Sequence, residues 1–226
     1  MTAPSYGTAF DLLRDAAGRH WDDYVTHDFV ANLADGSLPR AAFLHYLRQD
    51  YLFLNHFARA WALAVVKSET HDEMLTAVGS VNALVTNEVG LHIGICEQAG
   101  ISLDELNATS ERPANIAYTR YVLEAGYSGD LVDLLACLTP CVMGYGEIGL
   151  RLLDSHSNET YRHWIETYGG RDYQDLCHTV GTLLDQALTR RIGADFEQSP
   201  RWNSLCHRFE TATRLEVGFW QMGLTP

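Results

Sequence analysis

The sequence predicts an all-α fold. Apolar residues recur three and four positions apart through nearly all of its 226 residues, which is the period of an amphipathic helix. No run of alternating apolar and polar residues is long enough to indicate a β-strand. About eight helices are expected, too many for a simple four-helix bundle. Because 46% of the residues are apolar and no low-complexity linker or charge block interrupts them, we expect a single domain over residues 1–226.

Turn-forming residues place the first helix boundaries. Helices are expected over residues 5–22 and 24–34, and the stretch ADGSLP then marks a break. In this break Gly36 ends one helix, Ser37 is the expected N-cap, and Pro39 lies in the first turn of the next helix. That long helix should run from about Arg40 to Lys67.

The same signals divide the rest of the chain. A helix over 70–98 should end at Gly100, and SERP near residue 110 should start a helix that continues to about Glu124, before GYSGD. The remaining helices are expected around Pro140 and over 158–168, 171–191 and 201–222.

Charge and composition exclude several classes of function. The net charge of −13 disfavours contact with nucleic acid and anionic membranes. The N-terminus has no basic region followed by an apolar one, so no secretory signal is predicted. The apolar windows are broken by Arg, Asp, His or Glu, so no membrane span is predicted. We expect a cytoplasmic enzyme or binding protein with five free thiols, at 96, 137, 141, 177 and 206.

Two acids occupy apolar faces of predicted helices. Asp50 lies three residues after Leu47 and four before Leu54, and Glu216 aligns with Phe209 and Phe219. Burying an unpaired charge is costly, so each acid needs a partner or a function. The alternative to a functional role is that Asp50 forms an ion pair with an Arg from another helix. Two such acids on separate helices indicate a shared polar pocket, in which their pKa values would move apart.

The stretch LLACLTPCVMGYGEIGLRLL, residues 134–153, reads as a buried helix with Pro140 and Cys141 at its centre. Proline leaves the carbonyl of Ala136 without its helical partner, so a kink that opens space for a small ligand is expected. Tyr145 lies one turn after Cys141 on the same face. A free cysteine is a few per cent thiolate at neutral pH and a good nucleophile, although most buried cysteines are small hydrophobes. Cys141 is the candidate nucleophile.

Aromatic residues and histidines leave alternatives open. Phe53, Tyr118, Tyr145 and Tyr168 lie on four predicted helices; they either pack the core or hold a ring-shaped polar ligand. Glu88, His92 and Cys96 follow at intervals of four, so they are possible metal ligands. A di-iron bundle needs Glu-x-x-His twice, which the sequence lacks, so we expect no metal or other cofactor. His27 is interpreted as a helix-start residue rather than a haem ligand.

Five segments together resemble one family. HDFVANLADGSLP, FLHYLRQDYLFLNHFARAWALA, LTPCVMGYGEIG, YRHWIETYGG and LEVGFW occur in order over nearly the whole chain. They resemble the TenA family, thiaminase II or aminopyrimidine aminohydrolase, in its cysteine-containing branch. The resemblance implies a fold like that of haem oxygenase, without haem, assembled as a homotetramer. One departure is Val142 and Met143, where many relatives carry bulky aromatics, which alters the pocket wall.

The resemblance also implies a site. Its catalytic residues are Cys141 as nucleophile, with Glu216 and Asp50 as acids, and its substrate-binding residues are Phe53, Tyr118, Tyr145 and Tyr168. The implied reaction is hydrolysis at the CH2 on a 4-amino-2-methylpyrimidine ring, which releases ammonia from the aminomethyl compound or the thiazole half from thiamin. A non-catalytic pyrimidine-binding or regulatory protein and an oxidase of the same fold are the alternatives.

Overall fold

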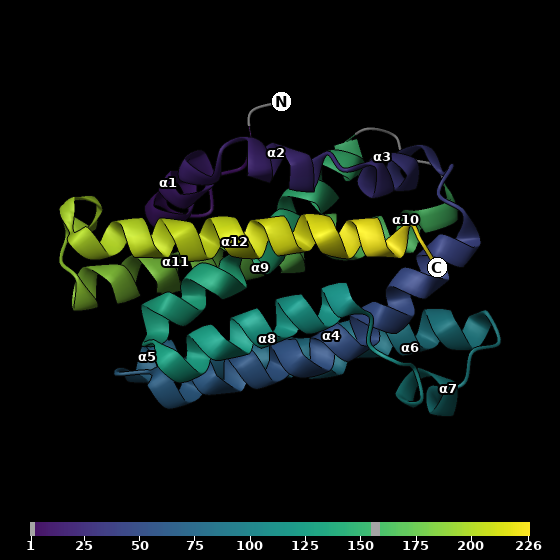
Figure 1. Ribbon diagram of the computed structural model, residues 1–226, viewed down its shortest axis with the longest axis horizontal. Helices are drawn as coiled ribbons and strands as arrows, with labels where there is room; N and C mark the ends of the chain where they lie inside the picture. The colour runs from purple at the N-terminus through teal and green to yellow at the C-terminus, as the bar shows by residue number, and fades with distance from the viewer. Residues whose placement is uncertain (1–2, 155–158) are drawn as a thin grey trace.

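The computed structural model describes residues 3–154 and 159–226, and it confirms the all-α prediction. Within these ranges the chain forms helices and connecting turns and no β-strand (Figure 1). The elements in chain order are α1 (Thr8–Ala17), α2 (Arg19–Val25), α3 (Asp28–Asp35), α4 (Arg40–Lys67), α5 (His71–Ala83), η1 (Leu84–Glu88), α6 (Val89–Gln98), α7 (Leu103–Asn107), α8 (Pro113–Ser128), α9 (Leu131–Asp154), η2 (Glu159–Tyr161), α10 (Arg162–Gly169), α11 (Arg171–Arg191), η3 (Phe196–Gln198) and α12 (Pro200–Gly223).

The N-terminal boundaries are only partly as predicted. The single helix expected over 5–22 is wrong, because Gly18, with φ of 51°, separates α1 from α2. Gly36 ends α3 in the left-handed conformation, as predicted. The N-cap of α4 is Pro39 rather than Ser37, but α4 itself has the predicted bounds.

The α-helical period of the helix expected over 70–98 is interrupted. Residues Leu84–Glu88 form a π-helical turn, η1, between α5 and α6. Such turns frequently mark functional sites, because one extra residue per turn changes the direction of the side chains. A short helix, α7, was not predicted, although Ser102 and Glu105 form its capping box.

From α8 onward some of the predicted helix ends are wrong: α8 is longer than predicted, and α10 begins at Arg162 rather than at residue 158. α8 continues four residues past Glu124, so the Gly and Tyr of GYSGD lie inside it. Pro140 lies inside α9 without ending it. Residue 158, where the helix over 158–168 was expected to begin, lies outside the described residues. α11 has the predicted bounds, and α12 begins at Pro200 with Ser199 as N-cap.

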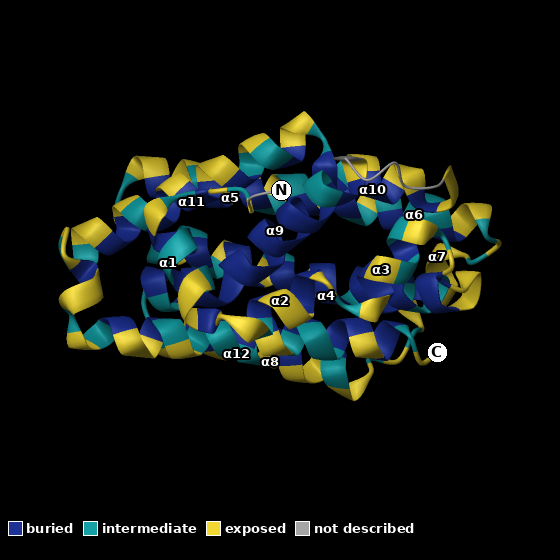
Figure 2. Ribbon diagram, turned by 90° about the horizontal axis from the view of Figure 1, so that it is seen from above, coloured by how far each residue is buried: buried dark blue, intermediate teal, exposed yellow. Residues whose placement is uncertain are grey.

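Helix α9 is the centre of the molecule. It packs against α2, α4, α8, α10, α11 and α12, and Figure 2 shows it buried among them. By length and apolar composition its segment Leu131–Leu153 passes as a membrane span, contrary to the prediction that no segment would. However, 94% of its most apolar window is buried inside the protein, which is the pattern of a core helix.

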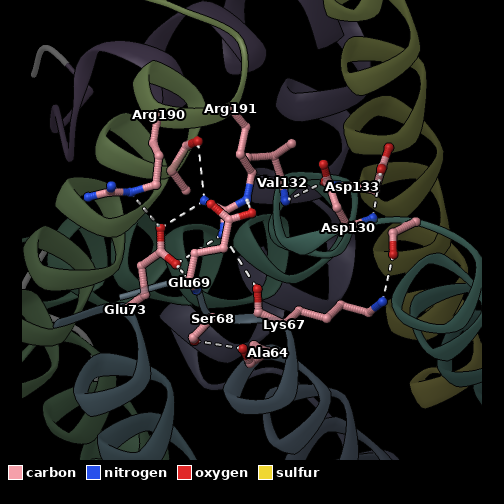
Figure 3. Close-up of polar contacts among 12 residues, drawn as sticks. Ala64, Lys67, Ser68, Glu69, Glu73, Asp130, Val132, Asp133, Arg190 and Arg191 are labelled. Carbon is pink, nitrogen blue, oxygen red and sulfur yellow. Dashed lines mark hydrogen bonds and ion pairs between the residues drawn. The ribbon is translucent and has the colours of Figure 1, made fainter. Parts of the chain in front are cut away.

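A buried ion pair joins the helix ends at one side of the bundle. Arg191, at the end of α11, donates to both carboxylate oxygens of Glu73 in α5, at 2.7 and 3.0 Å (Figure 3). Arg191 also donates to the carbonyl of Lys67, whose ammonium donates to the carbonyl of Gly129 after α8. These contacts fix the ends of α4 and α8 against α11, so the two helices hold a constant position around α9.

Close packing between α9 and α2 requires Gly144. A Cβ at this position would overlap the ring of Tyr24, which is fully buried. We expect Gly144→Ala to lower the free energy of unfolding by about 2 kcal/mol or more, because the overpacked ring must move. Gly94→Ala is the matched control on α6, since open space surrounds that position. It should change stability by less than about 1 kcal/mol in either direction. Urea unfolding of both variants measures this, and equal stability would contradict it.

Candidate functional site

Polar side chains from separate helices meet beside the middle of α9. Asp50 and Glu216, the two acids predicted on apolar faces, are both buried, at 2% and 1% exposure. The elements that carry the predicted site residues are α4 (Asp50, Phe53), α8 (Tyr118), α9 (Cys141, Tyr145), α10 (Tyr168) and α12 (Glu216). All seven are buried, and direct contacts or electrostatic interactions link them, as described below.

Glu216 is held by hydrogen bonds in an apolar surrounding. The Tyr118 hydroxyl donates to its Oε1 at 2.8 Å. Burial raises the pKa of Glu216 to about 8; the Tyr118 hydrogen bond opposes this rise, and the charge of Asp50 adds to it. At neutral pH Glu216 is therefore mostly a neutral acid. The charge of Asp50 acts on Glu216, so the two buried acids interact electrostatically.

Cys141 is buried, and its thiol interacts electrostatically with three buried acids, Glu216, Glu88 and Asp50. Burial first, and then these three acids, raise the pKa of the Cys141 thiol well above its ordinary value. The Cys141 thiol is therefore less readily ionised than a free cysteine. The thiol can react as a nucleophile only if its proton moves in the same step.

Asp50 has a partner that the sequence analysis did not identify. His92 Nε2 lies 2.6 Å from Asp50 Oδ2, and the Tyr46 hydroxyl donates to the same oxygen at 3.0 Å. The pairing with an Arg that was considered is absent from the described residues. Oδ1 of Asp50 accepts no hydrogen bond from any residue described. One carboxylate oxygen is thus anchored to the protein, and the other is available to a ligand.

The predicted aromatic residues form the walls. The Phe53 ring lies 5.0 Å from the Tyr118 ring and 5.3 Å from Phe219. The Tyr145 ring lies 4.9 Å from Tyr168, and its hydroxyl is 3.3 Å from that of Tyr46. Aromatic rings and hydroxyl groups therefore pack close to the buried acids, through Tyr118 beside Glu216 and Tyr46 beside Asp50.

Two further site residues were missed. The Tyr24 hydroxyl is buried without a hydrogen-bond partner, beside Glu216 and Cys141. An orphaned buried hydroxyl is unfavourable unless a ligand or water satisfies it. Glu88, at the end of η1, accepts a 3.4 Å hydrogen bond from Tyr168, and burial raises its pKa to about 7. The sequence marked Glu88 only as a possible metal ligand, and Tyr24 carried no signal.

Other candidates have structural roles. Glu147, close to Tyr145 in sequence, accepts from Trp21 Nε1 at 3.1 Å on another side of α9. His27 caps α3 by accepting from the Phe29 N–H, as interpreted from the sequence. In the part of the chain that the structure describes, no three His, Cys, Asp or Glu side chains gather to hold a metal ion. Both ring nitrogens of His92 contact oxygen atoms, so its spacing to Cys96 does not form a site.

A cavity lies next to the buried site residues described above. Its volume is about 680 Å³, and it is lined by residues of η1, α10 and α11 that include Glu88, Glu166, Asp172 and Tyr173. Glu88 and Tyr173 belong to both the cavity and the cluster, since Glu88 contacts Tyr168 and the Tyr173 ring lies 4.9 Å from Tyr168. The cavity therefore provides space directly outside the buried cluster.

The structure defines the class of protein as an all-α bundle in which a thiol, two carboxyl groups and aromatic side chains are buried together. The model of the TENA/THI-4/PQQC family matches residues 14–225. The chain therefore belongs to the TENA/THI-4/PQQC family.

Relatives cover almost the entire chain. An uncharacterized protein of Haemophilus influenzae is 41% identical over 221 residues, which is 95% of this chain and 98% of its own. An aminopyrimidine aminohydrolase of Halalkalibacterium halodurans is 31% identical over 205 residues, 89% of each chain. Among solved structures, a protein of Silicibacter sp. TM1040 described as a TenA family transcription regulator has a TM-score of 0.96 at 67% identity, with 98% of both chains covered. A TenA homologue of P. horikoshii has a TM-score of 0.85 at 26% identity, covering 96% of this chain and 98% of its own.

Proposed function

We propose that this protein hydrolyses 4-amino-2-methylpyrimidine compounds and replaces the group on the 5-CH2 by water. The aminomethyl compound would give the hydroxymethyl compound and ammonia, a salvage reaction, and thiamin would give the same product and its thiazole half. The observation that carries the proposal is the burial of Cys141, Glu216 and Asp50 on three packed helices, with the Tyr118 hydroxyl donating to Glu216 at 2.8 Å. The similarity to aminopyrimidine aminohydrolases supports the choice of ring.

The raised pKa values of both groups suit a coupled proton transfer. Glu216 gives its proton to a ring nitrogen and receives the thiol proton of Cys141 as the sulfur adds to a ring carbon. This addition breaks the aromaticity of the ring, and the electron pair released expels the group on the CH2. Water then adds at the CH2, and departure of the sulfur restores the aromatic ring. In sum a C–N bond is exchanged for a C–O bond, and the amine leaves with one proton of the water.

The remaining residues would bind the substrate. Asp50 Oδ1 is free to accept an N–H from the aminopyrimidine edge, and Phe53 offers a ring face for stacking. The hydroxyls of Tyr118, Tyr145 and Tyr168 would orient the ring and the water. The cavity beyond Glu88 offers space for the leaving group, which matters most for the larger thiazole half.

Turnover with two substrates tests the proposal. The hydroxymethyl product is followed by chromatography from the aminomethyl compound and from thiamin under identical conditions. We expect turnover of at least one, and the ratio of the two kcat/KM values identifies the preferred leaving group. Absence of product from both, with an intact protein, would overturn the proposed function.

A second candidate function is pyrimidine binding without catalysis. It is favoured by one observation, the 67% identity to a protein described as a transcription regulator. Tight binding of the hydroxymethyl compound by calorimetry, without turnover of either substrate, would support this alternative. The net charge of −13 disfavours direct contact with DNA in such a role.

We further propose that the protein assembles as a homotetramer, the state implied by the family resemblance. Helix α5 exposes Met74, Leu75 and Val78, and Val66 and Val85 before and after it are more than half exposed. Exposed apolar surface of this kind supports association between copies. Light scattering should give about four times the 25.3 kDa mass of one chain, and the mass of one chain would contradict the proposal.

A further inference from the structure

His92 is completely buried, and both of its ring nitrogens contact oxygen atoms. Nδ1 lies 2.8 Å from the backbone carbonyl oxygen of Glu88, and Nε2 lies 2.6 Å from Asp50 Oδ2. A carbonyl oxygen has no hydrogen to give. The contact with Glu88 therefore requires that Nδ1 carries a proton.

The contact with Asp50 requires a second proton. Two lone pairs at 2.6 Å would repel each other, so a hydrogen must lie between Nε2 and Oδ2. It belongs either to an imidazolium beside a carboxylate or to a carboxylic acid beside a neutral imidazole. In both cases the pair as a whole is uncharged.

A further contact decides between the two states. Trp164 Nε1 donates to the Tyr46 hydroxyl at 3.3 Å, and that hydroxyl donates its own hydrogen to Asp50 Oδ2. The Tyr46 hydrogen bond favours the imidazolium–carboxylate state, because an ionised carboxylate oxygen is a much stronger acceptor for it than the O–H oxygen of a carboxylic acid. Burial lowers the pKa of His92, but the hydrogen bonds to Asp50 and the Glu88 carbonyl and the charges of Asp50 and Glu88 raise it above its ordinary value.

We propose that His92 is a positioning residue, which as an imidazolium holds the Asp50 carboxylate with Oδ2 bound to the protein and Oδ1 presented to the ligand. This inference rests on the proposed function, because it assigns the pyrimidine amino group as the donor to Oδ1. An uncharged pair also lets the site keep Asp50 ionised close to Glu88 and Glu216 without gathering three negative charges.

The arrangement makes the site selective for an N–H donor. A 4-amino group can donate a hydrogen bond to Oδ1. A 4-oxo group would instead place an acceptor oxygen next to Oδ1, and the carboxylate cannot rotate to avoid it because Oδ2 is bound to the protein. We expect 4-oxo analogues to bind at least about 100-fold more weakly than the 4-amino product, because the carboxylate oxygen is left buried and unpaired.

The protonation state of His92 can be read without turnover. Ring 15N NMR of the wild-type protein, titrated from pH 6 to pH 8, should show one histidine that keeps both nitrogens protonated at pH 8, where exposed histidines are neutral. Its signal is assigned by its loss in His92→Gln or, if that variant does not fold, by its shift in Asp50→Asn. A neutral imidazole on His92, in either tautomer, would overturn the proposed ion pair.

A double-mutant cycle then tests whether His92 acts through Asp50. Calorimetry with the product 4-amino-5-hydroxymethyl-2-methylpyrimidine should show binding weakened about 10- to 100-fold in His92→Gln. In an Asp50→Asn background the same change should have little further effect. Additive losses would mean that His92 supports the fold in general and would overturn the positioning role. KM should rise more than kcat falls in His92→Gln.

The two proposals fail in different ways. A wild-type protein that neither binds nor hydrolyses the pyrimidine would overturn the proposed function together with the ligand assigned to Oδ1. The NMR result would still decide the ion pair. Turnover by wild type with a neutral His92 would instead sustain the function and overturn this inference.

Discussion

Replacement of Cys141 by alanine should lower kcat for the aminomethyl-pyrimidine by about a thousandfold or more. The physical reason is that the methyl group of alanine cannot add to the ring, so the proposed covalent route through the thiol is lost as a whole. The product should still bind, because Asp50, Phe53 and Tyr118 are unchanged. Product release from the aminomethyl compound and from thiamin, measured side by side with wild type, tests this expectation.

Cys137→Ala is the matched control. Cys137 is a buried free cysteine one turn earlier on α9, and its pKa is raised by burial to about 12. Its removal should leave kcat within a few-fold of wild type. Full hydrolysis by Cys141→Ser or Cys141→Ala would exclude the covalent mechanism, whereas equal losses in the Cys137 and Cys141 variants would indicate damage to the helix.

Glu216→Gln should lower kcat/KM by about 10²- to 10³-fold, because glutamine keeps the shape of the side chain but cannot exchange the proton. The pH dependence of kcat/KM tests the role of Glu216 as an acid more directly than the loss of activity does. The raised pKa of about 8 means that the acid form predominates below pH 8 and is lost as the pH rises through that value. Wild-type kcat/KM should therefore decline above about pH 8, and the variant should lack this decline.

Thiamin is the better substrate for this profile if it is turned over, since its thiazolium nitrogen carries no proton that would titrate in the same range. Glu147→Gln serves as the control, because Glu147 is another carboxyl with a pKa raised by burial, yet it faces Trp21 and Arg14. The pH profile of kcat/KM for the Glu147→Gln variant should match that of the wild-type protein. An unchanged alkaline decline in Glu216→Gln would assign the decline to another group and refute Glu216 as the acid.

Many of the helices could be predicted from features of the sequence that act within a few residues. The predicted bounds of α4 and α11 were correct, because apolar period, capping residues and glycine stops act within a few residues. The split at Gly18 and the π turn over Leu84–Glu88 were not predicted, since each depends on how the chain packs against other helices. The resemblance named seven site residues, and the apolar faces alone marked Asp50 and Glu216.

The sequence by itself determined that this protein is a helical bundle with two buried acids and a cysteine near a proline at its centre, because helical period places each of these side chains on the apolar face of its own helix. Tertiary structure alone decided which groups meet. His92 and Asp50 are 42 positions apart, and the Tyr118 hydroxyl donates to Glu216 from another helix. Such contacts depend on the angles and distances between packed helices, and these in turn set the burial and charge that raise the pKa values of Cys141 and Glu216.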